Sequence, residues 1–325
     1  MQSQNQTSVT RFFLVGFGDL HNMKMMFFSI ILVIYIMVFN ANFLVIILVV
    51  AYPSLHFPMY IFLSQLSLSE ILFTTNIVPN MLRLILIGGG TMSVRGCVTQ
   101  FCILCVPTIS QCLLLATMSF DRYVAICNPL HYTSIMTFRL QLNIVVFCWI
   151  SGFMLALVIY MFLNRLIFCH FNIINHFYCD IAPLIELSCS DTSYVELVIA
   201  LISVFIAFSP FMFIIVTYIF ILVNILRIPS SFGRQKAFST CSSHLTVVCM
   251  YYGTLTIIYL YPPGKHSLNV NKFLSLLYTL VTPLSNPIIY SLRNQDIRRA
   301  IYNFLSNCRK NDCIMVDKTC LNTFS

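Results

Sequence analysis

The chain alternates long apolar stretches with short polar connectors. A helix needs about 20 consecutive apolar residues to cross the hydrocarbon core of a bilayer. Seven stretches meet or approach this length, and the sixth is the weakest because serines, threonines and His244 crowd its first turns. The pattern therefore predicts seven membrane-spanning helices, at residues 27–50, 59–87, 98–127, 140–163, 197–226, 237–261 and 273–292.

The composition indicates that lipid is the main solvent of this chain. Apolar residues make up 59% of its 325 residues and charged residues only 9%, and the mean hydropathy is +0.88. A soluble domain carries roughly a quarter charged residues, so this chain could not cover a water-facing surface. We predict an all-α membrane protein, with a seven-transmembrane helix bundle over residues 27–292.

A short amphipathic helix is predicted after the seventh span, over residues 293–307. Asn294 can cap it, Ile297, Ile301, Phe304 and Leu305 form one face, and Arg298 and Arg299 form another, as in helices that lie at a membrane surface. Residues 308–325 form a polar tail, which we expect in the cytoplasm. Cys308 opens this tail, either as an acylation site or as an idle thiol.

The charges of the connectors predict the orientation. With the N-terminus outside, eleven of the eighteen Lys and Arg residues lie on the inner side, as the positive-inside rule requires. Asn5 begins an Asn-Gln-Thr glycosylation sequon, which agrees with an outer position. We therefore expect residues 1–26 to be an extracellular segment without a cleavable leader.

Four cysteines are predicted on the outer side: Cys97, Cys169, Cys179 and Cys189. An even number in an oxidising compartment favours two disulfides, and three pairings are open. The alternative is a metal site that uses Cys169, His170, His176 and Cys179.

The connector over residues 164–196 is long enough to be functional. If it is bridged to Cys97, it would lie as a lid across the outer mouth of the bundle. The glycines at 88–90 lie in another outer connector and predict a flexible spacer.

The pair Asp121-Arg122 closes the third span. Charged side chains where a membrane helix meets water are costly, so we interpret the pair as a functional site of a receptor that passes a signal inward. Near the inner end of the seventh span, Asn286-Pro287 precedes Tyr290. A proline kink flanked by an amide and a phenol allows two packings, as a switch needs.

Glu70 is the only acidic residue well inside a span. Asn42 and Asn286 lie at comparable depths in the first and seventh spans, and polar groups in hydrocarbon seek one another. We predict a buried network of Asn42, Glu70 and Asn286, serving as a switch element, as a cation-linked site, or only as packing between helices.

No catalytic signature is present. The chain lacks a nucleophile elbow, a phosphate-cradling glycine loop and a zinc-protease motif. We expect no enzymatic activity, no cofactor, no bound metal and no nucleic-acid partner.

Four motifs resemble those of the odorant (olfactory) receptors, a branch of the rhodopsin-like (class A) G-protein-coupled receptors. They are LHFPMY at 55–60, the segment 118–132, KAFSTCSSHL at 236–245 and the segment 283–294. The resemblance covers residues 10–307. It implies a multi-pass plasma-membrane receptor, surrounded by membrane lipid, that binds a small neutral volatile odorant. It also implies activation of a heterotrimeric G protein of the stimulatory (olfactory) type, which raises cyclic AMP.

The resemblance also assigns roles. Arg122 would meet the G protein, Asp121 would be its resting partner, and Tyr218 and Tyr290 would swing towards it. Tyr123, Asn286 and Pro287 complete the implied switch. The implied disulfides are Cys97–Cys179 and Cys169–Cys189. Carried over position by position, the ligand-binding residues would be Leu104, Cys105, Thr108, Ile109, Ile202, Ile206, Tyr252, Leu255, Tyr259 and Thr279.

Some positions depart from the family pattern: Ala41, Asn80, Pro107, Phe120 and Ser285. None removes a group that the implied mechanism requires. Two alternatives remain at this point. A receptor for an amine would want an aspartate at the pocket position that Leu104 or Cys105 holds, and a ligand-gated channel or transporter would want a charged pore ring.

Overall fold

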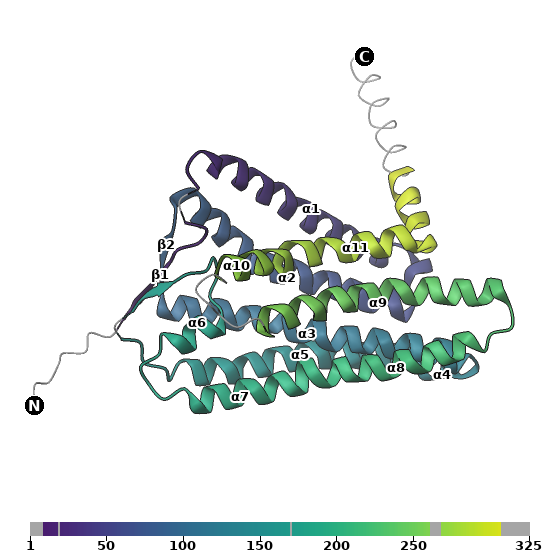
Figure 1. Ribbon diagram of the computed structural model, residues 1–325. Helices are drawn as coiled ribbons and strands as arrows, with labels where there is room; N and C mark the ends of the chain where they lie inside the picture. Colours follow the sequence, from purple (N-terminus) through teal and green to yellow (C-terminus); the bar gives the residue numbers. More distant parts are fainter. Residues whose placement is uncertain (1–8, 19, 170, 261–267, 307–325) are drawn as a thin grey trace, which may run out of the picture.

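The computed structural model describes residues 9–18, 20–169, 171–260 and 268–306, with the backbone alone at 236, 239, 240, 258–260, 268–270 and 291–293. Asn5, His170, Cys308 and the tail at 308–325 lie outside the described residues. The long helical segments of the described chain run along the molecule beside one another (Figure 1). They are α1 (Lys24–Ala51), α2 (Pro58–Ile87), α3 (Val94–Cys127), α5 (Phe138–Leu163), α7–η4–α8 (Ser193–Ser203, Val204–Phe208, Ser209–Leu226), α9 (Ser231–Leu260) and α10–η5–α11 (Leu268–Leu276, Leu277–Val281, Thr282–Arg293).

Six of these segments are long and apolar enough to cross a membrane, judged over the described residues. The seventh is α9, the segment in which the sequence places the polar first turns. The predicted seven-helix fold is confirmed. The helices start earlier than predicted, and side-chain caps explain two of these starts. Ser93 Oγ accepts a hydrogen bond from Gly96 N at 3.0 Å, and Thr137 Oγ1 accepts one from Leu140 N at 3.3 Å.

Short elements occupy the connectors. The helical ones are η1 (His21–Met23), η2 (Pro53–Leu55), η3 (Pro129–His131), α4 (Tyr132–Ile135) and α6 (Ile181–Glu186). The strands are β1 (Arg11–Leu14), β2 (Gly90–Ser93) and β3 (Ile173–Ile174). η4 and η5 are π-helical segments inside the fifth and seventh helices.

α3 is the central helix and packs against α2, α5 and α8. Its approach to α5 depends on Gly152, where an added Cβ would lie 2.7 Å from the carbonyl oxygen of Val106 and 2.8 Å from Ser110 Oγ. Small residues let membrane helices come this close.

A three-stranded sheet, which the sequence did not predict, closes one end of the bundle. β1 pairs antiparallel with β2 and parallel with β3, so the order is β2-β1-β3. The prediction of a flexible spacer at 88–90 was wrong. Gly88 ends α2 with a left-handed backbone conformation, at φ 73°, and Gly90 is the first residue of β2. We call this end of the bundle the sheet end, and the opposite one the Arg122 end.

Two disulfides hold the long connector after α5 at the sheet end. The structure joins Cys97 to Cys179 and Cys169 to Cys189. Both cysteines of the alternative metal site are therefore committed to disulfides, and this alternative is wrong. The described residues contain no cluster of His, Cys, Asp and Glu able to hold a metal ion.

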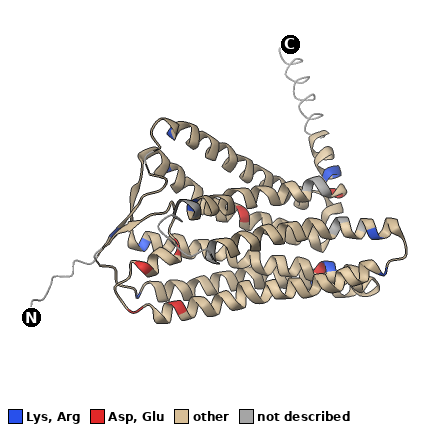
Figure 2. Ribbon diagram, viewed as in Figure 1, with Lys and Arg blue, Asp and Glu red and all other residues tan. Residues whose placement is uncertain are grey.

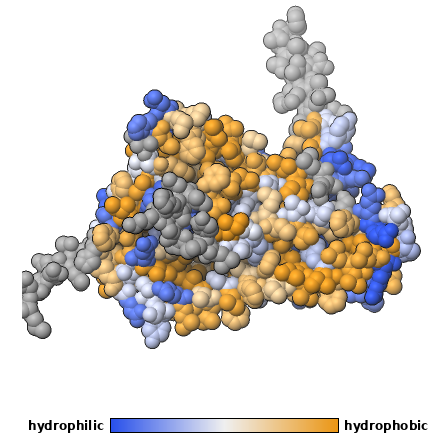
Figure 3. All heavy atoms as spheres, in the orientation of Figure 1, coloured by the Kyte–Doolittle hydropathy of each residue, from blue (hydrophilic) through white to orange (hydrophobic). Residues whose placement is uncertain are grey.

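The surface is apolar where a membrane would surround it. Charged residues lie mainly at the two ends of the helices and in the connectors (Figure 2). Large apolar side chains on the flanks of α1, α5 and α8, such as Ile36, Phe153 and Phe220, are exposed. Hydrophobic residues gather along the side of the bundle (Figure 3).

A helix over residues 295–306 follows α11. Asn294 separates the two helices with an extended backbone, φ −96° and ψ 119°. Its Oδ1 accepts a hydrogen bond from Asp296 N at 2.9 Å, so Asn294 caps the helix as expected. Ile297 and Ala300 are buried against the bundle, whereas Leu305 is exposed.

Candidate ligand and coupling sites

The charged pair lies in the last two turns of α3, where Asp121 is fully buried. Its Oδ2 accepts hydrogen bonds from Arg122 Nε, at 2.9 Å, and from the terminal nitrogen Nη2 of the same guanidinium. It is the one ion pair among the described side chains. The side chain of Arg122 is 15% exposed, so the guanidinium reaches the surface of the Arg122 end while its partner does not.

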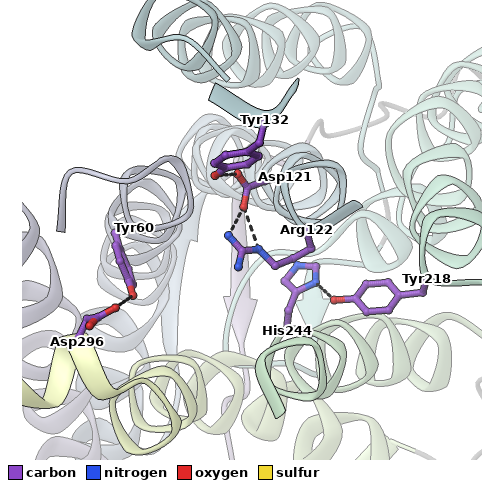
Figure 4. A network of polar contacts seen from close by, with 7 residues as sticks. All are labelled: Tyr60, Asp121, Arg122, Tyr132, Tyr218, His244 and Asp296. Atoms are coloured by element: carbon purple, nitrogen blue, oxygen red, sulfur yellow. Dashed lines mark hydrogen bonds and ion pairs between the residues drawn. The ribbon is translucent and has the colours of Figure 1, made fainter. Parts of the chain in front are cut away.

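The second oxygen of Asp121 is bound by a residue outside α3. Tyr132, the first residue of α4, donates its hydroxyl to Asp121 Oδ1 at 2.8 Å (Figure 4). Burial and then the charge of Asp121 raise the pKa of Tyr132, so the phenol stays protonated and can donate. The connector between α3 and α5 is thereby tied to the charged pair.

Tyr218 and His244 form a second polar contact at this end. The Tyr218 hydroxyl lies 2.7 Å from His244 Nδ1, and the contact joins α8 to α9. Figure 4 shows it beside Arg122. The structure thus places Tyr218, a predicted switch residue, against α9.

A cavity of about 820 Å³ opens at the Arg122 end. The walls come from α2, α3, α4, α9, α11 and the helix over 295–306. The described lining residues are Phe57, Met59, Tyr60, Arg122, Ala125, Tyr132, Phe232, Gln235, Ser243, Tyr290, Asn294, Gln295 and Asp296.

The other predicted switch residues divide between this cavity and the surrounding helices. Tyr290 lines the cavity, and its hydroxyl has no hydrogen-bond partner among the described atoms. Tyr123 instead packs edge-on against Phe220 of α8, with ring centroids 6.2 Å apart. Pro287 is buried within α11, three residues before Tyr290.

Two separate groups of hydrogen bonds stand where a single network was expected in the middle of the bundle. Asn286 donates its side-chain amide to Glu70 Oε1, which links α11 to α2. Asn42 instead donates to the carbonyl oxygen of Pro283 at 3.1 Å and to that of Val38 at 3.0 Å. All three predicted residues are buried, and the first, second and seventh helices are joined, but Asn42 bonds to backbone.

The predicted ligand-binding residues face the interior near the sheet end. Every member whose side chain is described is buried or half-buried, and the side chain of Tyr259 lies outside the described part. Ile206 and Thr279 fall within the π-helical segments η4 and η5. π-helical turns are frequent at functional sites.

Tyrosines join α3 to α9 in the same region. The Tyr251 hydroxyl donates to the carbonyl oxygen of Thr108 at 3.1 Å and lies 3.3 Å from Cys112 Sγ. Tyr252 packs against Phe211, with ring centroids 4.7 Å apart. Tyr252, itself a predicted ligand-binding residue, also packs edge-on against Tyr251, with ring centroids 5.3 Å apart, so these contacts join α3, α8 and α9.

The long connector covers this region as a lid, tied to helices on two sides. Cys179 N donates to Gln100 Oε1 at 3.2 Å, which fixes the lid to α3. Lys272 Nζ donates to Asn175 Oδ1 at 2.6 Å, and His176 Nε2 lies 3.3 Å from Ser275 Oγ. Burial and then the charge of Lys272 lower the pKa of His176 to about 3, so this imidazole is neutral.

Sequence reasoning missed the partners of the predicted residues. Tyr132 and His244 belong to two of the four motifs, so their presence was a signal, but nothing along the chain paired them with Asp121 and Tyr218. The contact of Tyr60 with Asp296 joins residues 236 positions apart and had no signal in the sequence.

These observations define a seven-helix membrane receptor: a lipid-facing bundle, a lid at one end, and a charged pair beside a cavity at the other. The family model that describes olfactory receptors matches residues 31–308. The chain is 42% identical to human olfactory receptor 11A1 over 93% of this chain and 96% of that protein. It is 41% identical to mouse olfactory receptor 5P68, over 94% of this chain and 97% of that protein.

Human olfactory receptor 6Y1 is similar to the same degree, with 42% identity over 95% of each chain. The chain belongs to the olfactory receptor family of G-protein-coupled receptors, and it is not an enzyme.

Proposed function

We propose that this receptor binds small, neutral, volatile molecules in the part of the bundle next to the lid. Binding activates a stimulatory G protein of the olfactory type at the Arg122 end and raises cyclic AMP. The N-terminus and the sheet end lie outside the cell, and the Arg122 end lies in the cytoplasm of a plasma-membrane receptor. The family supports odorant binding and G-protein coupling in general; the site, the G-protein type and the orientation are the proposal.

The proposed coupling to a G protein is supported by the cavity of about 820 Å³ beside Arg122. The guanidinium lies at the cavity surface, while the anion that neutralises it is buried behind it. A partner protein that enters the cavity therefore contacts the guanidinium of Arg122, whose positive charge is neutralised by Asp121 from inside the receptor.

The ligand half is supported by the chemistry of the interior under the lid. The hydroxyls of Thr108 and Thr279 donate to the carbonyl oxygens of Leu104 and Ser275, at 2.9 and 2.7 Å. The hydrogens of these two hydroxyls are bonded within their own helices and are not free to bind a ligand. Most of the predicted lining therefore presents apolar surface. Such a site holds a neutral ligand by burial with few hydrogen bonds, and we expect micromolar affinity because association costs offset much of the burial.

Coupling is tested by measuring cyclic AMP in cells that express the receptor with the olfactory G protein, against a panel of neutral volatiles. We expect dose-dependent increases that Arg122→Ala eliminates for every ligand at unchanged surface expression. A response that survives Arg122→Ala would refute the role of this residue.

The ligand site is tested by two neighbouring residues of α7. Ile202 is half-buried towards the bundle, whereas Leu201 is 50% exposed on the outer surface. Ile202→Ala should change the ranking of ligands, and Leu201→Ala, which removes a side chain of similar size, should not. Equal effects on the ranking would place the ligand elsewhere.

A further inference from the structure

Two charged side chains line the cavity at the Arg122 end, among its described lining residues: Arg122 and Asp296. They lie on different walls, the first on α3 and the second in the first turn of the helix over 295–306. Each has an internal partner. Arg122 is paired with Asp121, and Asp296 Oδ2 accepts a hydrogen bond from the Tyr60 hydroxyl at 2.9 Å (Figure 4).

The Tyr60 contact fastens the last helix to α2. The same hydroxyl lies 3.0 Å from Asn294 Oδ1, the atom that caps the helix by accepting from Asp296 N. The cap, the carboxylate and the phenol therefore form one cluster on the cavity wall. Tyr60 neutralises no charge, so the carboxylate of Asp296 is held by a hydrogen bond but not paired with a cation among the described side chains.

Few other anions are available to Arg122. The chain has ten Asp and Glu residues, and none lies between Glu196 and Asp296. Asp121 is fully buried and does not line the cavity. If Arg122 leaves Asp121, the guanidinium moves into a space whose described lining contains one carboxylate. An arginine side chain is long and flexible, and a guanidinium is well suited to bind a carboxylate through two hydrogen bonds.

We propose that Asp296 is the second counter-ion of Arg122: its carboxylate binds the guanidinium when the Asp121–Arg122 pair opens. Until then, Tyr60 holds this carboxylate through its hydrogen bond. The inference rests on the proposed function, because it concerns the active form of the coupling site. Tyr60 and Asp296 are positioning residues: they act on the partner through Arg122.

The test is the basal cyclic AMP level of cells that express the receptor with the stimulatory G protein, normalised to surface expression. Tyr60→Phe frees the carboxylate and should raise the basal level about two- to fivefold, the range that a solvent-accessible ion pair provides. Asp296→Asn removes the second counter-ion and should lower it below that of the wild type. The double variant should behave like Asp296→Asn, because Tyr60 acts only through Asp296.

Tyr302→Phe is the matched control, since Tyr302 lies on the same helix and is 73% exposed. Hydrogen exchange of the purified receptor, measured at residues 295–300, checks the contact without any G protein. Tyr60→Phe should speed exchange there relative to Tyr302→Phe, and equal rates would overturn the inference.

The two proposals fail differently. If Arg122→Ala silences the basal signal but Tyr60→Phe and Asp296→Asn leave it unchanged, or act additively, the counter-ion role is wrong and the coupling site stands. If Arg122→Ala leaves the signal unchanged, the coupling site itself is wrong and the counter-ion role falls with it.

Discussion

The strand β1 offers a quantitative test of how the lid is held. Phe12 is fully buried and packs edge-on against Phe168 of the lid, with ring centroids 5.0 Å apart. Its neighbour Phe13 points to the other face and is 38% exposed. Phe12→Ala removes a buried ring, a change that costs about 3–5 kcal/mol in protein interiors.

The cost should fall on the strand and the lid rather than on the helices. β1 reaches the lid through backbone hydrogen bonds from Phe13 N to the carbonyl oxygen of Asn172, at 2.6 Å, and from Val15 N to that of Ile174, at 3.0 Å. Exchange of a protected amide reports the free energy of the local opening. A loss of about 3 kcal/mol corresponds to roughly a hundredfold faster exchange.

Hydrogen exchange of the receptor in lipid nanodiscs measures this directly. For Phe12→Ala we expect the amides of residues 13 and 15 to exchange about a hundredfold faster. Phe13→Ala, which removes the same ring from the exposed face, should change the rates only a few-fold. Similar acceleration in both variants would show that the buried face of β1 does not hold the lid.

Three further predictions follow from the same end of the receptor and from the bundle. Cys97→Ser removes a disulfide, a loss that typically costs about 2–5 kcal/mol of stability, and should prevent surface expression as measured by flow cytometry. Cys249 is a free, exposed cysteine, so Cys249→Ser should leave surface expression unchanged. Gly152→Ala forces α5 away from α3 and should lower the thermal stability of the purified receptor. Gly253→Ala, with nothing within 4 Å of the added carbon, should leave the thermal stability unchanged or raise it. A Gly253→Ala variant less stable than Gly152→Ala would contradict the packing. Because the pKa of His176 is lowered to about 3, against about 6.5 when unfolded, its stabilisation is complete above pH 6.5 and is lost as the pH falls towards 3. Between pH 7.5 and 5 the loss is about 2 kcal/mol, so the lid amides should exchange faster at pH 5, after correction for intrinsic rates, in the wild type but much less so in His176→Gln.

The sequence predicted the helices because their signal is local. Runs of apolar residues predicted the seven spans to within a few positions. The early starts of α3 and α5 depend on the single capping residues Ser93 and Thr137, which a pattern of apolar residues does not reveal. The sheet was missed because its strands are two to four residues long. Strands this short have no measurable alternation and exist only through pairing between distant connectors.

The candidate sites were predictable in their members but not in their contacts. Charge and polarity inside apolar stretches single out Asp121, Arg122 and Glu70 without a structure. The pairing of Asp121 with Tyr132, and the turn of Asn42 towards the backbone of Pro283, depend on how helices rotate against one another. Helix rotation is set by packing across the whole bundle, which no local pattern contains.

The π-helical segments η4 and η5 change the phase of the two helices that contain them. An α-helix turns about 100° per residue, and a π-helical turn accommodates one residue more than an α-helical turn. The residues before and after Leu277–Val281 therefore do not share one continuous helical wheel. If the segment became a regular α-helix without losing a residue, Tyr290 would turn about 100° away from the cavity that it lines. The face that α10 presents to the lid and the face that α11 presents to Arg122 are thus set relative to one another by the π-helical turn between them. A change of this turn to an α-helical one can therefore misalign the two ends without altering any residue of either site.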